Sequence, residues 1–118
     1  MSDFFGTSAR AYLTLFTGAA VTSGSNAACS ITITGVAAMR HYVVGVLWSY
    51  NGAPTGGRLT STGLEGAEVD FDITTSGPGP LLTPPVVGER GSDVSFTLAA
   101  GGAGVVGKIN VWYATVPA

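Results

Sequence analysis

The chain has 118 residues, a net charge of −2 and one cysteine. This length predicts a single domain, and a chain of this size buries roughly two thirds of its unfolded surface, which is enough for one core without disulfide bonds. Only 10% of the residues are charged, against about 25% in an ordinary soluble domain. The five basic residues are scattered singly and build no positive field, so we expect no nucleic-acid partner.

The low charge content also bears on assembly. Hydroxyl side chains supply much of the polarity, through 10 Ser and 14 Thr. This composition fits a Thr-rich sandwich surface, and it also fits a surface that is covered by copies of the same chain or by a larger assembly. We favour the assembly, because few charges leave only weak colloidal repulsion between molecules.

The N-terminal segment Met1–Arg10 is interpreted as an arm, and residues 11–118 as one β-sandwich domain. Phe4 and Phe5 are adjacent aromatic residues in this arm, and we expect them to dock on the parent domain or on a neighbour. The arm has no basic region followed by an apolar run, so we do not expect a signal peptide. No apolar stretch approaches the roughly 20 residues of a membrane span. We therefore expect a protein that is made in a cytoplasm and stays soluble or assembles there.

Alternating apolar and polar residues between turn signals predict about eight strands or strand-like segments. In chain order these are Ala11–Thr17, Ala28–Thr34, His41–Tyr50, Arg58–Thr62, Ala67–Thr75, Leu81–Gly88 and the two strands of Phe96–Tyr113. The pattern is typical of an all-β fold, an antiparallel β-sandwich of the jelly-roll type, with a small closed barrel as the alternative. The segment Gly18–Ala27 is expected to be a loop.

The longest apolar run, His41–Tyr50, has apolar side chains on both faces. Simple alternation puts Tyr42 on the same face as Trp48, and Val43 on the opposite face. We expect a central strand that is covered on both sides, with Trp48 in the core. By contrast, two adjacent prolines in Leu81–Gly88 exclude that segment from the centre of a sheet and predict an edge.

The segment Phe96–Tyr113 predicts a strand, a glycine-rich turn and a strand, which together would form a hairpin with one apolar side. Trp112 falls on the polar side of the second strand, together with Lys108 and Asn110. Two explanations stay open for this residue. A large aromatic side chain on a polar face marks an interface, or else a bulge after Gly107 rotates the indole into the core.

The acids Glu68, Asp70 and Asp72 alternate along the strand Ala67–Thr75, and therefore stand on one face about 6.5 to 7 Å apart. A flat strand does not converge carboxylates around calcium. We interpret the row as a solvated outer face that is paired with Arg58 across the sheet. A role in binding an ion or another subunit is left as the alternative.

No residue pattern points to an enzyme. Cys29 is in phase with Ile31 and Ile33, which predicts a buried, unreactive thiol. His41 has no acidic or histidine partner at metal-ligand spacing and is interpreted as a capping or hydrogen-bonding residue. The glycine-rich turn is followed by a strand instead of a helix, which excludes a phosphate loop. We expect no catalytic residue, no metal and no cofactor.

Three runs of the sequence together resemble a known group of proteins. They are SYNGAPTGGRLT (Ser49–Thr60), VDFDIT (Val69–Thr74) and FTLAAGGAGVVGKINVWY (Phe96–Tyr113). Over Ala28–Tyr113 the chain is similar to small virion proteins of tailed bacteriophages, of the capsid decoration or cement type. The resemblance implies a β-sandwich, commonly trimeric, that sits on the outside of the head and bridges neighbouring capsid subunits. It assigns no binding role to particular positions.

We therefore expect a non-enzymatic virion protein that binds the major capsid protein as an oligomer and stabilises the head. The resemblance implies that this oligomer is a homotrimer on the capsid surface. Phe4, Phe5 and Trp112 are the expected contact residues. The alternatives are a receptor-binding or head-fibre knob, and a carbohydrate-binding sandwich, which would need Tyr12, Phe16 and Trp112 on one accessible face.

Overall fold

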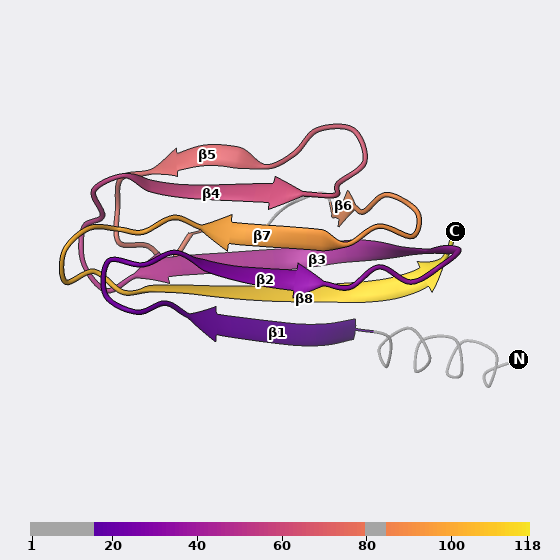
Figure 1. Ribbon diagram of the computed structural model, residues 1–118, viewed down its shortest axis with the longest axis horizontal. Helices are drawn as coiled ribbons and strands as arrows, with labels where there is room; N and C mark the ends of the chain where they lie inside the picture. Colours follow the sequence, from indigo (N-terminus) through magenta and orange to yellow (C-terminus); the bar gives the residue numbers. More distant parts are fainter. Residues whose placement is uncertain (1–15, 80–84) are drawn as a thin grey trace, which may run out of the picture.

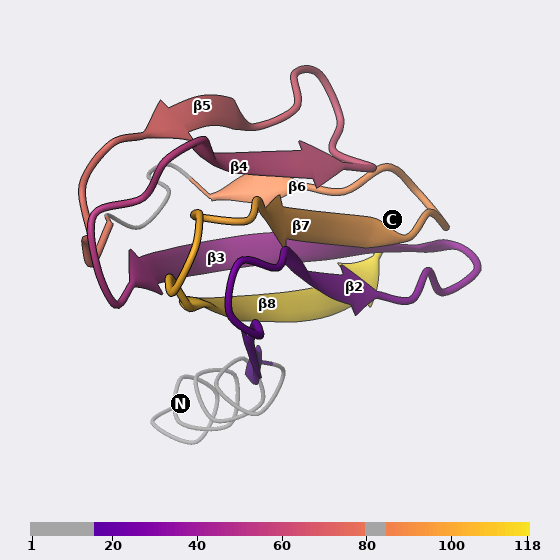
Figure 2. The same cartoon turned by 60° about the vertical axis from the view of Figure 1, so that its left-hand side comes forward.

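The computed structural model describes residues 16–79 and 85–118, which form a sandwich of two antiparallel sheets (Figure 1, Figure 2). Sheet A has the strand order β1–β8–β3–β6, and sheet B has the order β2–β7–β4–β5. The strands are β1 (Phe16–Thr22), β2 (Cys29–Ile33), β3 (Met39–Tyr50), β4 (Gly57–Thr62), β5 (Asp70–Ile73), β6 (Val86–Val87), β7 (Val94–Leu98) and β8 (Gly107–Pro117). None of the described residues is in a helix, so this part of the chain contains no helix that could span a membrane.

The connectivity is that of a jelly roll. β1 pairs with β8, β2 with β7, β3 with β6 and β4 with β5, all antiparallel, as if one long hairpin of strand pairs had been rolled up. Successive pairs fall in opposite sheets, so most connections cross from one sheet to the other. The predicted antiparallel sandwich of about eight strands is confirmed, and the described strands form two separate sheets instead of one closed barrel.

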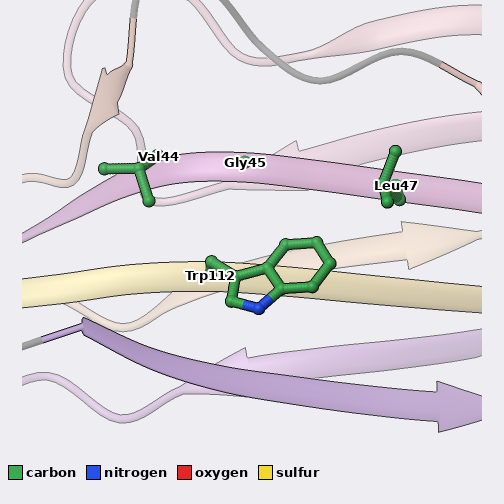
Figure 3. A pocket seen from close by; sticks show the side chains of 4 residues that line it. All are labelled: Val44, Gly45, Leu47 and Trp112. Atoms are coloured by element: carbon green, nitrogen blue, oxygen red, sulfur yellow. The ribbon is translucent and has the colours of Figure 1, made fainter.

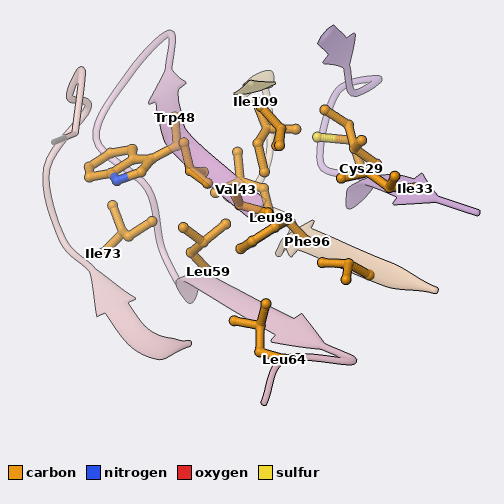
Figure 4. Packing of buried hydrophobic residues seen from close by; sticks show 14 of the residues in the cluster. Cys29, Ile33, Val43, Trp48, Leu59, Leu64, Ile73, Phe96, Leu98 and Ile109 are labelled. Atoms are coloured by element: carbon orange, nitrogen blue, oxygen red, sulfur yellow. The ribbon is translucent and has the colours of Figure 1, made fainter. Parts of the chain in front are cut away.

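The core lies between the sheets and is built from alternate apolar positions of the strands. Val94, Phe96 and Leu98 of β7 and Ile109 and Val111 of β8 are each at most 1% exposed. Figure 4 shows side chains from both sheets meeting in this cluster. Burying a side chain of this size contributes about 1.5 to 3 kcal/mol, so the inner faces hold the two sheets together.

The predicted hairpin over Phe96–Tyr113 is wrong. β7 belongs to sheet B and β8 to sheet A, so the two strands are not neighbours in one sheet. Both of their apolar sides do face the same core, as the alternation indicated. The connection, residues 99–106, is longer than the about two to five residues of a hairpin loop, and it crosses the roughly 10 Å between packed sheets.

A β-bulge in β3 overturns the simple alternation expected for this strand. The register with β8 shifts between Val43 and Gly45. Val43 therefore joins Trp48 on the core side, whereas Tyr42 points outward and is 38% exposed. β3 is central in its sheet and Trp48 is buried, and both of these predictions are confirmed. The expectation that the strand is covered on both sides is wrong, because on its outward face Tyr42 is exposed and Val44 and Leu47 are only half-buried.

Three strand boundaries differ from the sequence-based expectation or refine it. β1 runs from Phe16 to Thr22, through residues expected to form a loop, because these residues pair with β8 in continuous register. β5 covers only Asp70–Ile73, the middle of the predicted strand. β6 is a two-residue edge strand, Val86–Val87, which confirms the edge position predicted for the proline-containing segment.

Candidate interaction surface

The outer face of sheet A carries an apolar surface around Trp112. Trp112 lies on β8, opposite to the core residues Ile109 and Val111 in the alternation, and it is 38% exposed. No bulge follows Gly107, because β8 pairs with β1 in continuous register. The bulge lies in β3, beside Trp112. Of the two orientations left open by the sequence, the structure therefore has the outward one.

Two glycines lie beside the indole, and one of them, Gly18, makes room for it. Gly18 in β1 and Gly45 in β3 are the cross-strand partners of Trp112. A Cβ atom on Gly18 would lie 3.1 Å from Nε1 and 3.2 Å from Cδ1 of the indole, so the ring rests on the bare backbone of β1. Figure 3 shows the ring along β8 with its nitrogen on the side of β1, and Val44 and Leu47 on β3. Together these residues line a shallow apolar depression of about 350 Å³.

The name Trp112 face is used below for the apolar outward side chains at the centre of this sheet: Tyr42, Val44, Leu47 and Trp112. None of these side chains is charged. Along β8 the outward positions change from Trp112 through the half-buried Asn110 to the exposed Lys108. An apolar surface that is bordered by polar residues is typical of a contact with another protein.

The outer face of sheet B is polar by contrast. Hydroxyl pairs join its strands: Ser30 Oγ and Thr97 Oγ1 are 2.7 Å apart, and Thr62 Oγ1 and Ser95 Oγ are 2.6 Å apart. These hydroxyls already satisfy one another and border on water. The two outer faces of the sandwich therefore offer a partner different chemistry.

Arg58 and Asp70 form an ion pair on the same polar face. Nε and Nη2 of Arg58 donate to the two carboxylate oxygens of Asp70, each at 2.7 Å, which confirms the pairing predicted across the sheet. These hydrogen bonds lower the pKa of Asp70 below its usual value. Both side chains are about half exposed, so solvent screens the pair and its contribution to stability is small.

Glu68 does not share the face of Asp70. It precedes β5, and its carboxylate accepts hydrogen bonds from Ser61 Oγ at 2.9 Å and from the backbone N–H groups of Gly63 at 3.0 Å and Leu64 at 3.1 Å. Its role is to close the connection between β4 and β5. The expectation of three acids on one face is therefore wrong. Among residues 16–79 and 85–118, no three His, Cys, Asp or Glu side chains gather so that they could hold a metal ion.

His41 is a buried hydrogen-bonding residue, as predicted. It is 3% exposed, with Nε2 lying 2.9 Å from the carbonyl oxygen of Thr34 and Nδ1 lying 2.7 Å from Oγ1 of Thr115. Because a carbonyl only accepts, Nε2 donates, and in a neutral ring Nδ1 then accepts from the hydroxyl. The ring also packs edge-on against Tyr113. Its contacts join the start of β3 to the end of β8.

Cys29 is buried on the core side of β2, next to the other inward-facing residues of this strand. Burial raises the pKa of its thiol above the usual value, because the thiolate would lose its hydration. The thiol is therefore protonated near neutral pH, which agrees with the prediction of an unreactive cysteine.

The glycine-rich connection 99–106 packs against the connection between β3 and β4. The N–H of Thr55 donates to the carbonyl of Gly101 at 2.7 Å, and the N–H of Val106 donates to Oδ1 of Asn51 at 2.8 Å. The two sequence segments that carry most of the resemblance, APTGG and LAAGGAGVVGK, thus lie together at one end of the sandwich (Figure 1).

Glycines in this connection serve its geometry. Gly102 and Gly104 have φ values of 104° and 75°, which glycine adopts without steric cost. A strand, β8, follows them, so no helix N-terminus is present to hold an anion. The interpretation as turn residues is confirmed.

The remaining predicted contact residues lie elsewhere. Phe4, Phe5 and Tyr12 are outside the described residues, so their roles stay predictions. Phe16 begins β1 and is paired with Ala114 of β8, in the same sheet as Trp112. Sequence reasoning missed Tyr42 as a member of this surface, because the bulge that turns it outward leaves no mark in a run of apolar residues.

Comparisons with known proteins support the fold alone. No protein-family model matches the chain, and no curated protein is significantly similar to it. A solved structure of the Drosophila NLP core, described for pentamer formation and histone binding, matches with a TM-score of 0.55 at 15% identity, over 86% of this chain and 97% of that one. The CUB1-EGF-CUB2 fragment of human MASP-1/3 matches with a TM-score of 0.49 at 13% identity, over 88% of this chain and 42% of the fragment. The Drosophila structure shows that this sandwich occurs elsewhere as a complete domain.

Proposed function

We propose that this chain is a non-enzymatic structural protein of a virion. It is a capsid decoration protein that binds the major capsid protein on the outside of the head through the Trp112 face and stabilises the head. The sequence resemblance supplies the class of protein. One structural observation supports the choice of surface: the Trp112 face is exposed, apolar and uncharged, whereas the opposite outer face carries paired hydroxyls and an ion pair.

The energetics favour a protein partner at the Trp112 face. Each Å² of apolar surface that a partner removes from water contributes about 25 cal/mol. Trp and Tyr dominate binding energies in many interfaces, because a large rigid ring is buried at a small cost in rotamer entropy. Trp112 is positioned for this role, since its ring is supported from below by the backbone at Gly18.

Stabilisation of the head would follow from clamping. Each copy buries surface across a joint between capsid subunits, so that opening the shell must break additional contacts. An oligomer presents several such faces and gains avidity without strong individual contacts. The homotrimer implied by the resemblance is part of this proposal, as is assembly onto the virion in the host cytoplasm.

The test is binding to empty capsids of the source virus. Purified protein should sediment with the capsids and raise the temperature at which the shells open. Trp112→Ala should weaken binding at least tenfold, because loss of a central aromatic contact costs about 1.4 kcal/mol or more. Absence of wild-type binding would refute the decoration role.

Phe71→Ala is the matched control. Phe71 is 38% exposed, as is Trp112, but it lies on β5 at the edge of sheet B. This variant should bind capsids like the wild type once circular dichroism shows that it is folded. Equal losses in the two variants would contradict the assignment of the contact to the Trp112 face.

Binding to a glycan array without binding to capsids would favour the carbohydrate-binding alternative, for which Phe16 and Trp112 lie on neighbouring strands. The pentamer and the histone binding described for the Drosophila protein are not carried over, because 15% identity supports a shared fold alone.

A further inference from the structure

The two lateral edges of the sandwich are built differently. On one side lie β5, which carries Asp70 and Asp72, and β6, which pairs over only two residues after Pro85. Charges, prolines and short strands are the features that keep an edge from pairing with another chain. On the other side lie β1 and β2, whose sequences FTGAAVT and CSITI contain no charge and no proline (Figure 1, Figure 2). β1 is the longer of these two edges.

The direction of the backbone groups in β1 follows from one hydrogen bond. Ser23, directly after β1, donates its N–H to the carbonyl of Gly107 at 2.8 Å. Backbone groups alternate sides along an antiparallel strand, so Gly18, Ala20 and Thr22 direct their N–H and C=O groups away from β8. β1 is the outermost strand of sheet A, and no described strand lies beyond it to receive these groups.

We propose that this edge of β1 pairs with β1 of a second copy of the chain, antiparallel about a two-fold axis. The two A sheets then become one continuous sheet. The register that we propose centres on Ala20, which lies between Gly18 and Thr22, and places Ala20 opposite Ala20 of the second copy. The same register places Gly18 opposite Thr22. This inference does not depend on the proposed function.

Self-complementarity is the reason to choose a second copy as the partner. An uncharged edge meets no repulsion from an identical uncharged edge, and the small side chains at Gly18, Ala19 and Ala20 allow close approach. The two-fold axis of an antiparallel pair is perpendicular to the sheet, so the Trp112 faces of both copies lie on the same side. Pairing therefore doubles the apolar surface and leaves it accessible.

A two-fold contact cannot close a trimer. Between two monomers this contact makes a dimer, and between two trimers it joins one trimer to the other. The assembly of the wild-type protein should therefore contain an even number of chains.

Ala20→Pro tests the contact. Proline removes the central outward N–H and places its ring in the path of the second strand, while every hydrogen bond from β1 to β8 is kept. Ala19, which precedes it, is already extended, as a residue before proline prefers. We expect the mass of the assembly, measured by light scattering after size exclusion, to be halved by this change.

Ala20→Thr is the control, because it keeps the N–H and suits a strand, and it should leave the mass unchanged. A wild-type mass of one or three chains would overturn the proposal, as would a mass that Ala20→Pro does not change. The mass of the Ala20→Pro protein separately reports the trimer, since it equals three chains if that part of the proposed function holds and one chain if it does not.

Ala20→Cys provides a second measurement in case the proline variant fails to fold. A short bifunctional maleimide should crosslink this variant into dimers, while the wild type, whose Cys29 is buried, should stay uncrosslinked. Absence of crosslinked dimer at a concentration where the wild type is oligomeric would also overturn the proposal.

Discussion

Phe96 is the largest fully buried side chain of the described core. Removing most of a buried Phe leaves a cavity, which typically costs about 3 to 5 kcal/mol. We expect Phe96→Ala to lower the free energy of unfolding by this amount, measured by urea denaturation. A domain with a total stability of about 5 to 15 kcal/mol would then be close to unfolding.

Phe71→Ala serves again as the comparison, because Phe71 is 38% exposed and less area is lost from the interior. Its loss of stability should be clearly smaller. Equal losses of stability in the two variants would mean that Phe96 is packed no more tightly than Phe71, which would contradict its assignment to the core.

The Cys29 thiol should make stability depend on pH in the alkaline range. Burial raises its pKa in the folded protein above the value of about 8.5 in an unfolded chain. Below the pKa of the unfolded chain the thiol is protonated in both the folded and the unfolded protein, so the free energy of unfolding does not depend on it. Above it the unfolded chain releases the proton first, so the free energy of unfolding falls as pH rises toward the folded pKa.

The measurement is urea denaturation of the wild type and of Cys29→Ala from about pH 7 to pH 10. The difference between the two proteins reports the ionisation of the thiol together with its effect on Tyr50, whose pKa the Cys29 charge helps to raise. We expect the wild type to lose stability relative to the variant as pH rises. A constant difference would show that the thiol ionises as easily in the folded protein as in the unfolded chain.

At the scale of single residues, alternation in the sequence predicted Phe96, Cys29 and Trp48 in the core correctly, because period two follows directly from strand geometry. Tyr42 and Glu68 were misplaced. In each case the pattern continued through a point where the backbone departs from a regular strand, at the β3 bulge and in the connection before β5.

At the scale of elements, the connection between β4 and β5 depends on Glu68. Glu68→Ala leaves the hydroxyl of Ser61 and the N–H groups of Gly63 and Leu64 without this acceptor. The part-buried groups among them lose a net interaction of about 0.5 to 1.5 kcal/mol per bond. We expect a lower thermal midpoint and faster amide hydrogen exchange at Gly63 and Leu64.

Asp72→Ala is the control for this prediction. Asp72 is an exposed acid on the neighbouring strand, and its removal should change stability by no more than about 0.5 kcal/mol. If both acids proved equally dispensable, the carboxylate of Glu68 would not be closing the connection.

Strand pairing was the element-scale feature that the sequence did not reveal. β7 and β8 each showed one apolar side, and adjacent apolar-sided strands with a glycine-rich link suggested a hairpin. The same alternation is produced when two strands face each other across a core. Only the three-dimensional arrangement distinguishes the two cases, because periodicity identifies a face and not the strand beside it.

At the scale of the whole molecule, the jelly roll has consequences for folding. All strand pairs except β4–β5 join segments that are distant in sequence, as in β1 with β8 and β2 with β7. Such pairs require large loops to close before any contact forms, so folding is expected in milliseconds to seconds. Stopped-flow refolding followed by tryptophan fluorescence checks this, and a microsecond rate would contradict it.

The candidate site could be predicted only in part. Trp112 stood out because an aromatic residue occupied a polar phase of its strand. The sequence could not show that Gly18 and Gly45 lie beside it, since these residues come from strands far away in the chain. The difference between the two outer faces likewise depends on which strands share a sheet.

The contact between the two connections that contain APTGG and LAAGGAGVVGK limits what the proposed resemblance to phage decoration proteins can say about the binding surface. APTGG and LAAGGAGVVGK are held together by backbone and side-chain hydrogen bonds at one end of the sandwich, away from the centre of the A sheet. In this chain both motifs therefore serve to hold one end of the sandwich together, and chains that share them are expected to share this local structure. The side chains of the outer face of sheet A, which the motifs do not include, would determine the partner.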